Sequence, residues 1–313
     1  MKAKMINKVS LEGYIYEHNL AIKESGPNSK APGTKYINGE LKIATDDECL
    51  NIVSVFYTYV TETTKSGANR TYQTLKNIID GNIKTIVKDG KEKAGKIHVD
   101  TSIALNEFYS DKTGTEELVS VKRNEGGFIH QVDTLSEASL TRNSFETDII
   151  ITKVIRKEAD PERDQPEKVI ISGAIFDFRK AILPVEFTTV HPGAMDYFEG
   201  LQASASNPVF TKVRGKEVSQ TVVNTVTEES AFGEASVREV RRSRKAHLID
   251  WAAPDVYEWD TEGTITADEF RKCIADRETY LATKKQERQN YVANQTKAAS
   301  AVAQPAASTD FKF

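Results

Sequence analysis

Tyrosines and lysines are interleaved along the N-terminal part of the chain in a pattern suited to nucleic-acid binding. The stretch KVSLEGYIYEHNL, residues 8–20, alternates apolar and polar positions with period two, which is typical of a strand with one apolar face. This alternation places Tyr14 and Tyr16 opposite the apolar face. By the same parity, Tyr36 and Lys42 share one face of the next predicted strand.

Aromatic faces beside cationic side chains are what single-stranded nucleic acid requires of a protein. Bases stack on aromatic rings at about 1–3 kcal/mol per base, and lysine or arginine binds the phosphates. The alternative to DNA binding is an ordinary structural role, because a strand tyrosine can equally pack in the core and a surface lysine commonly stays solvated. The candidate DNA-binding residues are Tyr14, Tyr16, Lys23, Lys30, Lys35, Tyr36, Lys42, Tyr57, Tyr59, Lys65 and Arg70.

The bulk composition is that of a globular chain of 313 residues, 39% apolar and 28% charged, with a net charge of −4. This length allows two domains of ordinary size. The mildly acidic balance excludes a wholly basic, histone-like binder but leaves a local cationic groove open. Cys49 and Cys273 are isolated, so neither a disulfide framework nor a zinc site is expected. No signal peptide or membrane span is predicted, and the expected location is the cytoplasm.

The order of predicted elements in residues 1–132 is three strands, a short helix and two more strands. Strands are expected over 8–16, 36–45 and 51–61, and a helix over 71–80. Strand-like stretches follow at 82–88 and 96–108, and a hairpin with Gly126 and Gly127 at its turn closes the unit. A five-stranded barrel with a helix between its third and fourth strands is the OB-fold. The fold class expected is therefore mainly β, with an OB-fold-type barrel.

Three stretches of this unit resemble bacterial and phage single-stranded-DNA-binding proteins. They are INKVSLEGYI (6–15), LKIATDD (41–47) and YQTLKNIIDGNIKTIVKDG (72–90), and the likeness is clearest over residues 6–132. The resemblance implies a non-catalytic protein that coats single-stranded DNA in replication or recombination, in a phage or mobile element. The resemblance also implies that Tyr57 and Tyr59 occupy the strand positions at which the family has its base-stacking aromatic residues. The chain departs from the family in having no tryptophan in the third strand. The resemblance allows a homo-oligomer, but the family's tetramer is not carried over.

The stretch KVIISGAIFDFRKAIL, residues 168–183, repeats the opening stretch loosely and pairs Gly173 with Gly13. We therefore expect 168–183 to open a second, diverged barrel over 168–251, without an obvious helix at the matching place. Residues 133–167 are predicted to be a linker or bridging segment. A turn and a long helix are expected over 252–300, and a disordered tail over 301–313.

Several further motifs leave alternatives open. The basic run REVRRSRK (238–245) could bind phosphates or protect an edge strand. Residues 258–269 match parts of an EF-hand loop, although a turn feeding a capped helix explains the same residues. The tail, ending in DFKF, could dock replication or recombination proteins or be a loose end. With no catalytic motif and no expected cofactor or metal, the competing functions are a β-rich assembly protein and a calcium-modulated interaction module.

Overall fold

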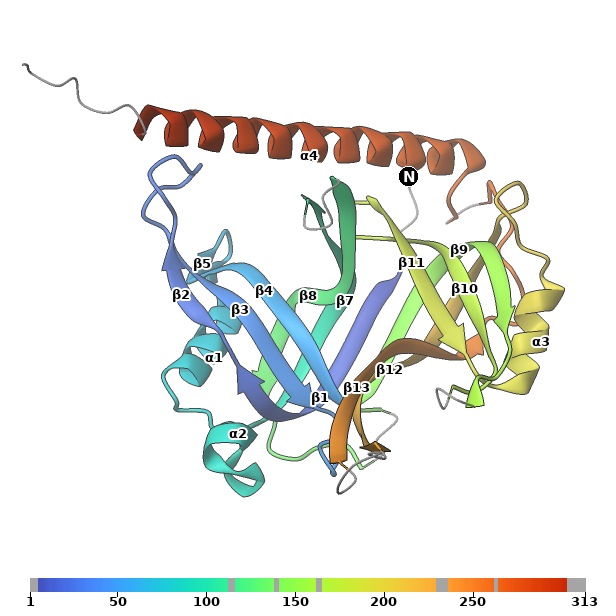
Figure 1. Ribbon diagram of the computed structural model, residues 1–313, viewed down its shortest axis with the longest axis horizontal. Helices are drawn as coiled ribbons and strands as arrows, with labels where there is room; N and C mark the ends of the chain where they lie inside the picture. The colour runs from blue at the N-terminus through green and yellow to red at the C-terminus, as the bar shows by residue number, and fades with distance from the viewer. Residues whose placement is uncertain are drawn as a thin grey trace, which may run out of the picture.

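The computed structural model describes residues 5–111, 116–137, 141–161, 165–228, 236–261 and 264–302, and the protein is mainly β. Ten of its strands form two closed rings of five, and a long C-terminal helix lies above both (Figure 1). The C-terminal residues 303–313, including the DFKF tip, lie outside the described residues. Within the described part, no helix is long and apolar enough to cross a membrane.

The first ring has the strand order β1-β3-β4-β8-β7, and β7 returns to β1. Every pairing is antiparallel except that of β4 with β8. A helix, α1, lies between the third and fourth ring strands along the chain. This topology is the OB-fold and confirms the expected fold class. The elements are β1 (Asn7–His18), β3 (Lys35–Ala44), β4 (Ile52–Thr61), α1 (Arg70–Ile79), β7 (Lys96–Ser110) and β8 (Glu117–Gln131).

Small elements fill the connections of the first ring. They are β2 (Ala21–Glu24), β5 (Thr63–Thr64), β6 (Gly67–Ala68), α2 (Ile86–Asp89) and the 3-10 turn at Lys91–Lys93. The strand predicted over 82–88 is wrong, because this stretch holds the short helix α2. The predicted hairpin turn at Gly126 and Gly127 is also wrong. Both glycines lie inside β8, where the β7–β8 register shifts and Gly127 has φ +100°. A Cβ on Gly127 would lie 2.0 Å from the Asp100 carbonyl oxygen, so the close approach of the strands requires glycine.

The second ring repeats the topology of the first, strand for strand. Its order is β9-β10-β11-β13-β12, closing back to β9, with only β11 and β13 parallel. A helix, α3, again lies between the third and fourth strands. The elements are β9 (Asn143–Lys157), β10 (Lys168–Phe176), β11 (Ile182–Thr189), α3 (Pro192–Gly200), β12 (Val209–Glu228) and β13 (Ser236–Ala252).

This topology corrects three sequence-based expectations. The predicted linker 133–167 contains β9, the first strand of the second ring. The stretch that opens at Lys168 is consequently the second strand, not the first. A helix does occupy the matching place, because the His191-Pro192-Gly193 turn is the start of α3, with proline in its first turn.

The two glycines of the repeated stretch make the same contact from opposite strands. A Cβ on Gly13, in the first strand of its ring, would lie 2.0 Å from the Ala44 carbonyl oxygen in the second strand. A Cβ on Gly173, in the second strand, would lie 2.3 Å from the Ile150 carbonyl oxygen in the first strand. In each ring the first two strands therefore approach too closely for any side chain. The two similar stretches therefore share this close contact, although they are not equivalent strands of their rings.

The two rings are joined through their first strands. Residues Asn7–Leu11 of β1 pair antiparallel with Asn143–Thr147 of β9, while β1 also pairs within its own ring. One apolar core cluster runs through both rings, with Val9 and Phe145 among its members. The rings are consequently held side by side (Figure 1).

The last helix, α4 (Ala267–Val302), starts in a capping box. The Thr266 hydroxyl accepts from the Glu269 N–H at 3.0 Å, and the Glu269 carboxylate accepts from the Thr266 N–H at 3.1 Å. Ile265 is fully buried in an apolar cluster with Phe270. The EF-hand positions Glu262 and Gly263 lie outside the described residues. Glu269 therefore caps the helix. This is the role that the alternative to calcium binding, a turn before a capped helix, predicts for it.

Candidate nucleic-acid interface

A groove runs across both rings in three adjoining hollows. The first, of about 390 Å³, lies between β2, β3 and β4 and includes Lys23. It shares Phe56 and Arg123 with a second hollow, of about 270 Å³, at the junction of the rings. The second shares Lys122 and Lys245 with a third, of about 550 Å³, over β10 and β11. We call these three hollows together the inter-ring groove.

Phe56 is the aromatic side chain at the centre of the first ring's part of the groove. It stands on β4 between the inward-facing Val55 and Tyr57, so its half-buried ring is on the outer face. The Arg123 guanidinium lies 5.2 Å from the ring centroid and is also bound to Glu125 at 2.7 Å. An aromatic face with a cation beside it suits base stacking next to a phosphate.

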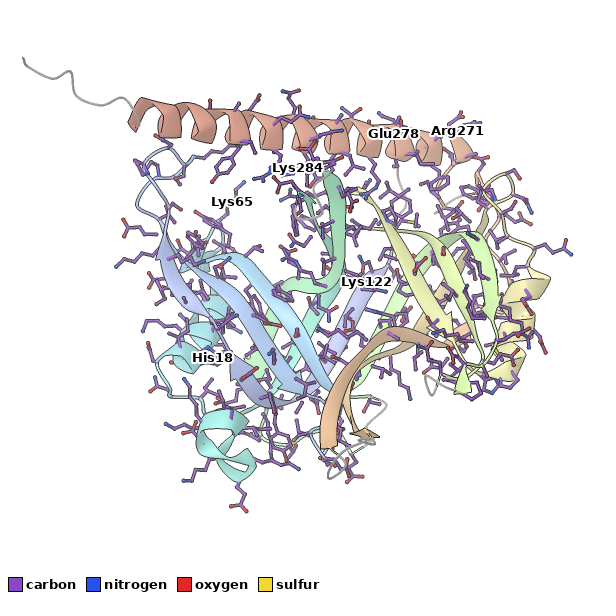
Figure 2. All side chains as sticks on the ribbon, viewed as in Figure 1. His18, Lys65, Lys122, Arg271, Glu278 and Lys284 are labelled. Atoms are coloured by element: carbon purple, nitrogen blue, oxygen red, sulfur yellow. The ribbon has the colours of Figure 1, made fainter. Side chains whose placement is uncertain are left out.

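Lys122 lies where the two rings meet, in the space between β8 and β11 (Figure 2). Its ammonium group donates to the Glu186 carbonyl oxygen at 2.6 Å and lies 5.0 Å from the centroid of Phe187. Burial lowers the pKa of Lys122 to about 8, although the nearby Glu217 and Glu186 act in the opposite direction. Lys122 is therefore a cation with a titration close to neutral pH.

Glu217 is the buried anion that connects the rings behind Lys122. Asn124 donates to the Glu217 carboxylate at 2.8 Å, and His247 Nε2 lies 3.0 Å from its other oxygen. The Asn143 amide donates to the Glu217 backbone carbonyl at 2.6 Å. Burial alone would raise the pKa of Glu217, but His247, the Asn124 hydrogen bond and Lys122 together hold it below its usual value. The partners of the carboxylate come from β8 of the first ring and β13 of the second, so it ties both rings together.

Part of the predicted site gathers on β2, β3 and β4. The Tyr36 and Tyr59 rings lie 4.5 Å apart, and Tyr59 is 51% exposed. Lys23 donates to the Asn38 side chain at 2.9 Å and lines the groove, while Lys35 is exposed on β3 opposite Glu24. Tyr36, Tyr59 and Lys35 are not among the residues that line the three hollows.

The outward placement predicted for Tyr57 is wrong. This side chain is 1% exposed and belongs to the core of the first ring, with Val53 and Val55 on the same face. Burial raises the pKa of Tyr57 far above its usual value. Between Tyr57 and Val60, β4 carries one residue more than β3 does between Gly39 and Ile37. This bulge turns Tyr59 outward although it has the parity of Tyr57.

The other predicted residues also lie outside the groove. Tyr14 has Lys91 5.2 Å above its ring, and Lys42 is ion-paired with Glu17 at 2.5 Å. Arg70 lines a separate hollow between α1 and β8. Among the lining residues of the three hollows, none of these is included, nor are the half-buried Tyr16 and the exposed Lys30 and Lys65.

The residues at the centre of the inter-ring groove are not among the DNA-binding residues predicted from the sequence. Phe56 could have been found, because Val53 and Val55 inside the ring place it outside. Lys122 and Arg123 lie in a stretch for which the sequence predicts only a hairpin. Of the basic run 238–245, Lys245 is the residue whose side chain is described, and it lines two of the hollows.

These features define a protein with two OB-type rings and an aromatic and cationic groove between them. The YorF family profile matches residues 5–287, and the chain belongs to the YorF family. No curated protein matches the sequence.

Among solved structures, one similar chain is a deletion mutant of the single-stranded DNA binding protein from Thermus aquaticus. It is 12% identical, the match covers 84% of this chain and 100% of that chain, and the TM-score is 0.47. A similarity of this size does not bear on the function of this chain.

Proposed function

We propose that this protein binds single-stranded DNA along the inter-ring groove and catalyses no reaction. The observation that supports this most is that one hollow at the junction of the two OB-type rings is lined by Phe56, Arg123, Lys122 and Lys245. Aromatic faces stack on unpaired bases of any sequence, and the cations bind phosphates. Lys168 extends the cationic lining onto the second ring. Sequence-independent binding of this kind suits a protein that coats DNA during replication or recombination.

Binding is expected to favour single strands strongly and to weaken steeply with salt. Stacking needs unpaired bases, so duplex DNA loses the aromatic contribution. The logarithm of the affinity should fall linearly with the logarithm of salt concentration, by about 0.7 per phosphate neutralised. Fluorescence anisotropy with labelled oligo-dT and a duplex of equal length measures both. Equal affinities would contradict the proposal, and no binding at low salt would favour the alternative of a protein-binding assembly module.

The affinity is also expected to fall as the pH rises above about 8, the pKa of Lys122 in the free protein. A bound phosphate favours the ammonium form and so raises that pKa. The contribution of Lys122 is therefore complete below pH 8 and is lost as the pH passes the higher pKa of the complex. Anisotropy titrations between pH 7 and pH 9 test this expectation.

Two variants at the same position serve as controls for the pH dependence. Lys122→Arg stays charged throughout, so its affinity should not change over this range. Lys122→Met should bind more weakly than the wild type at pH 7 and show the same flat profile. A wild-type pH profile as flat as that of Lys122→Arg would show that Lys122 does not meet a phosphate.

A further inference from the structure

The face of α4 that looks toward the rings is cationic where a packed helix would be apolar. The half-buried residues over the described side chains of α4 past its first turn are Cys273, Arg277, Leu281, Lys284 and Arg288, spaced by four, four, three and four positions. This spacing defines one face of a helix. Three of the five are cations, and Figure 2 shows Lys284 on the underside of α4. This face is therefore unsuited to permanent burial.

Among the described side chains of α4, those at its start are packed firmly on the protein. Phe270 and Cys273 join the apolar cluster at the end of the second ring. Arg277 binds the carboxylate of Glu107, whose side chain is 4% exposed, with one of the contacts at 3.1 Å. Arg277 thus marks the end of the anchored part.

Beyond Arg277, the described contacts of α4 with the rest of the chain are mainly to the end of the β7–β8 hairpin. Lys285 lies 3.9 Å from Glu116, and Arg288 lies 3.6 Å from Asp111, which is 70% exposed. Exposed pairs of this kind contribute about 0–1 kcal/mol. The helix is 36 residues long, about 54 Å, and it crosses above both rings (Figure 1). The two ion pairs that join its distal part to the hairpin are therefore weak.

The distal part of α4 also carries aromatic rings beside its cations. The Lys284 ammonium lies 5.7 Å from the Tyr280 centroid, and the Arg288 guanidinium lies 6.0 Å from the Tyr291 centroid. Tyr280 is 46% exposed and Tyr291 is 56% exposed. Phosphate-binding cations beside stacking rings are the combination by which proteins bind single strands without sequence preference.

We propose that α4 beyond Arg277 is a second contact surface for the strand, which closes over DNA bound in the inter-ring groove. This inference rests on the proposed function. Lys284 and Arg288 bind phosphates, and Tyr280 and Tyr291 offer faces to bases. The hairpin carboxylate of Asp111 occupies Arg288 in the absence of DNA and is replaced by a phosphate when the strand binds. Because the helix lies across the strand, it slows dissociation more than it changes association.

The experiment compares two double variants of the full chain that each remove two cations from α4. Lys284→Gln/Arg288→Gln changes the face toward the rings, whereas Arg271→Gln/Lys272→Gln changes exposed positions near the helix start. Stopped-flow dissociation of labelled oligo-dT should be about tenfold faster for the first variant. Its salt slope should be smaller by about 1.4, which corresponds to two phosphates. The second variant should behave as the wild type, and circular dichroism should be unchanged in both.

Asp111→Asn separates DNA contact from a purely structural role, because it breaks the same ion pair from the other side. If α4 binds the strand, Asp111→Asn retains DNA as long as the wild type or longer. If Asp111→Asn loses DNA as fast as Lys284→Gln/Arg288→Gln, or the two double variants are alike, the role of α4 is overturned. A wild-type chain that retains no DNA would instead overturn the proposed function itself.

Discussion

Replacing Glu217 by alanine is expected to lower the free energy of unfolding by about 3–5 kcal/mol, because each buried polar group that loses its partner costs about 1–3 kcal/mol. The change leaves His247, with which Glu217 is paired at 3.0 Å, and the amide of Asn124 without their buried partner. It also removes the anion that favours the charged form of Lys122. Urea unfolding followed by circular dichroism gives the difference directly.

A neighbouring carboxylate provides the control for this loss. Glu186 also lies close to Lys122, but its side chain is exposed. Glu186→Ala should therefore change the free energy of unfolding by no more than about 0.5 kcal/mol. A loss below about 1 kcal/mol for Glu217→Ala would show that the rings are held together by the β1–β9 pairing and the apolar core alone.

The first ring could be predicted from sequence because its strands are buried on one face. Residues of β1 and β4 alternate between the core and the surface, so period two was visible, and α1 ends before a glycine. The first strand of the second ring gave no such signal. Ile149, Ile150 and Ile151 are all fully buried, with Ile149 and Ile151 in the core of the rings and Ile150 in the cluster beneath α4. A strand buried on both faces has no alternation, and its charged flanks suggested a linker.

The candidate site was predictable only in part, for two physical reasons. The groove is assembled from residues far apart in the chain, such as Phe56, Lys122 and Lys245, and only the packing of the rings brings them together. Parity also fails at a bulge. A strand pattern cannot show the extra residue between Tyr57 and Val60 that separates the buried Tyr57 from the exposed Tyr59.

Replacing Phe56 by alanine is expected to weaken the binding of single-stranded DNA about tenfold while leaving the first ring folded. One lost base stack costs about 1–3 kcal/mol, and 1.4 kcal/mol is a factor of ten. The Phe56 ring is half-buried on the outer face and forms part of two hollows of the groove, so its removal leaves the core intact. Anisotropy with labelled oligo-dT measures the affinity, and urea unfolding measures the stability.

The neighbouring Tyr57 supplies the matched control, because it differs from Phe56 chiefly in facing the core. Tyr57→Phe should leave DNA affinity unchanged and raise the free energy of unfolding by up to about 1 kcal/mol, since the buried hydroxyl has no hydrogen-bond partner among the described residues. Tyr57→Ala should instead destabilise the fold by about 3–5 kcal/mol, as truncation of a buried aromatic does. Normal DNA affinity in Phe56→Ala, with lowered affinity in Tyr57→Phe, would reverse the assignment of the two faces of β4.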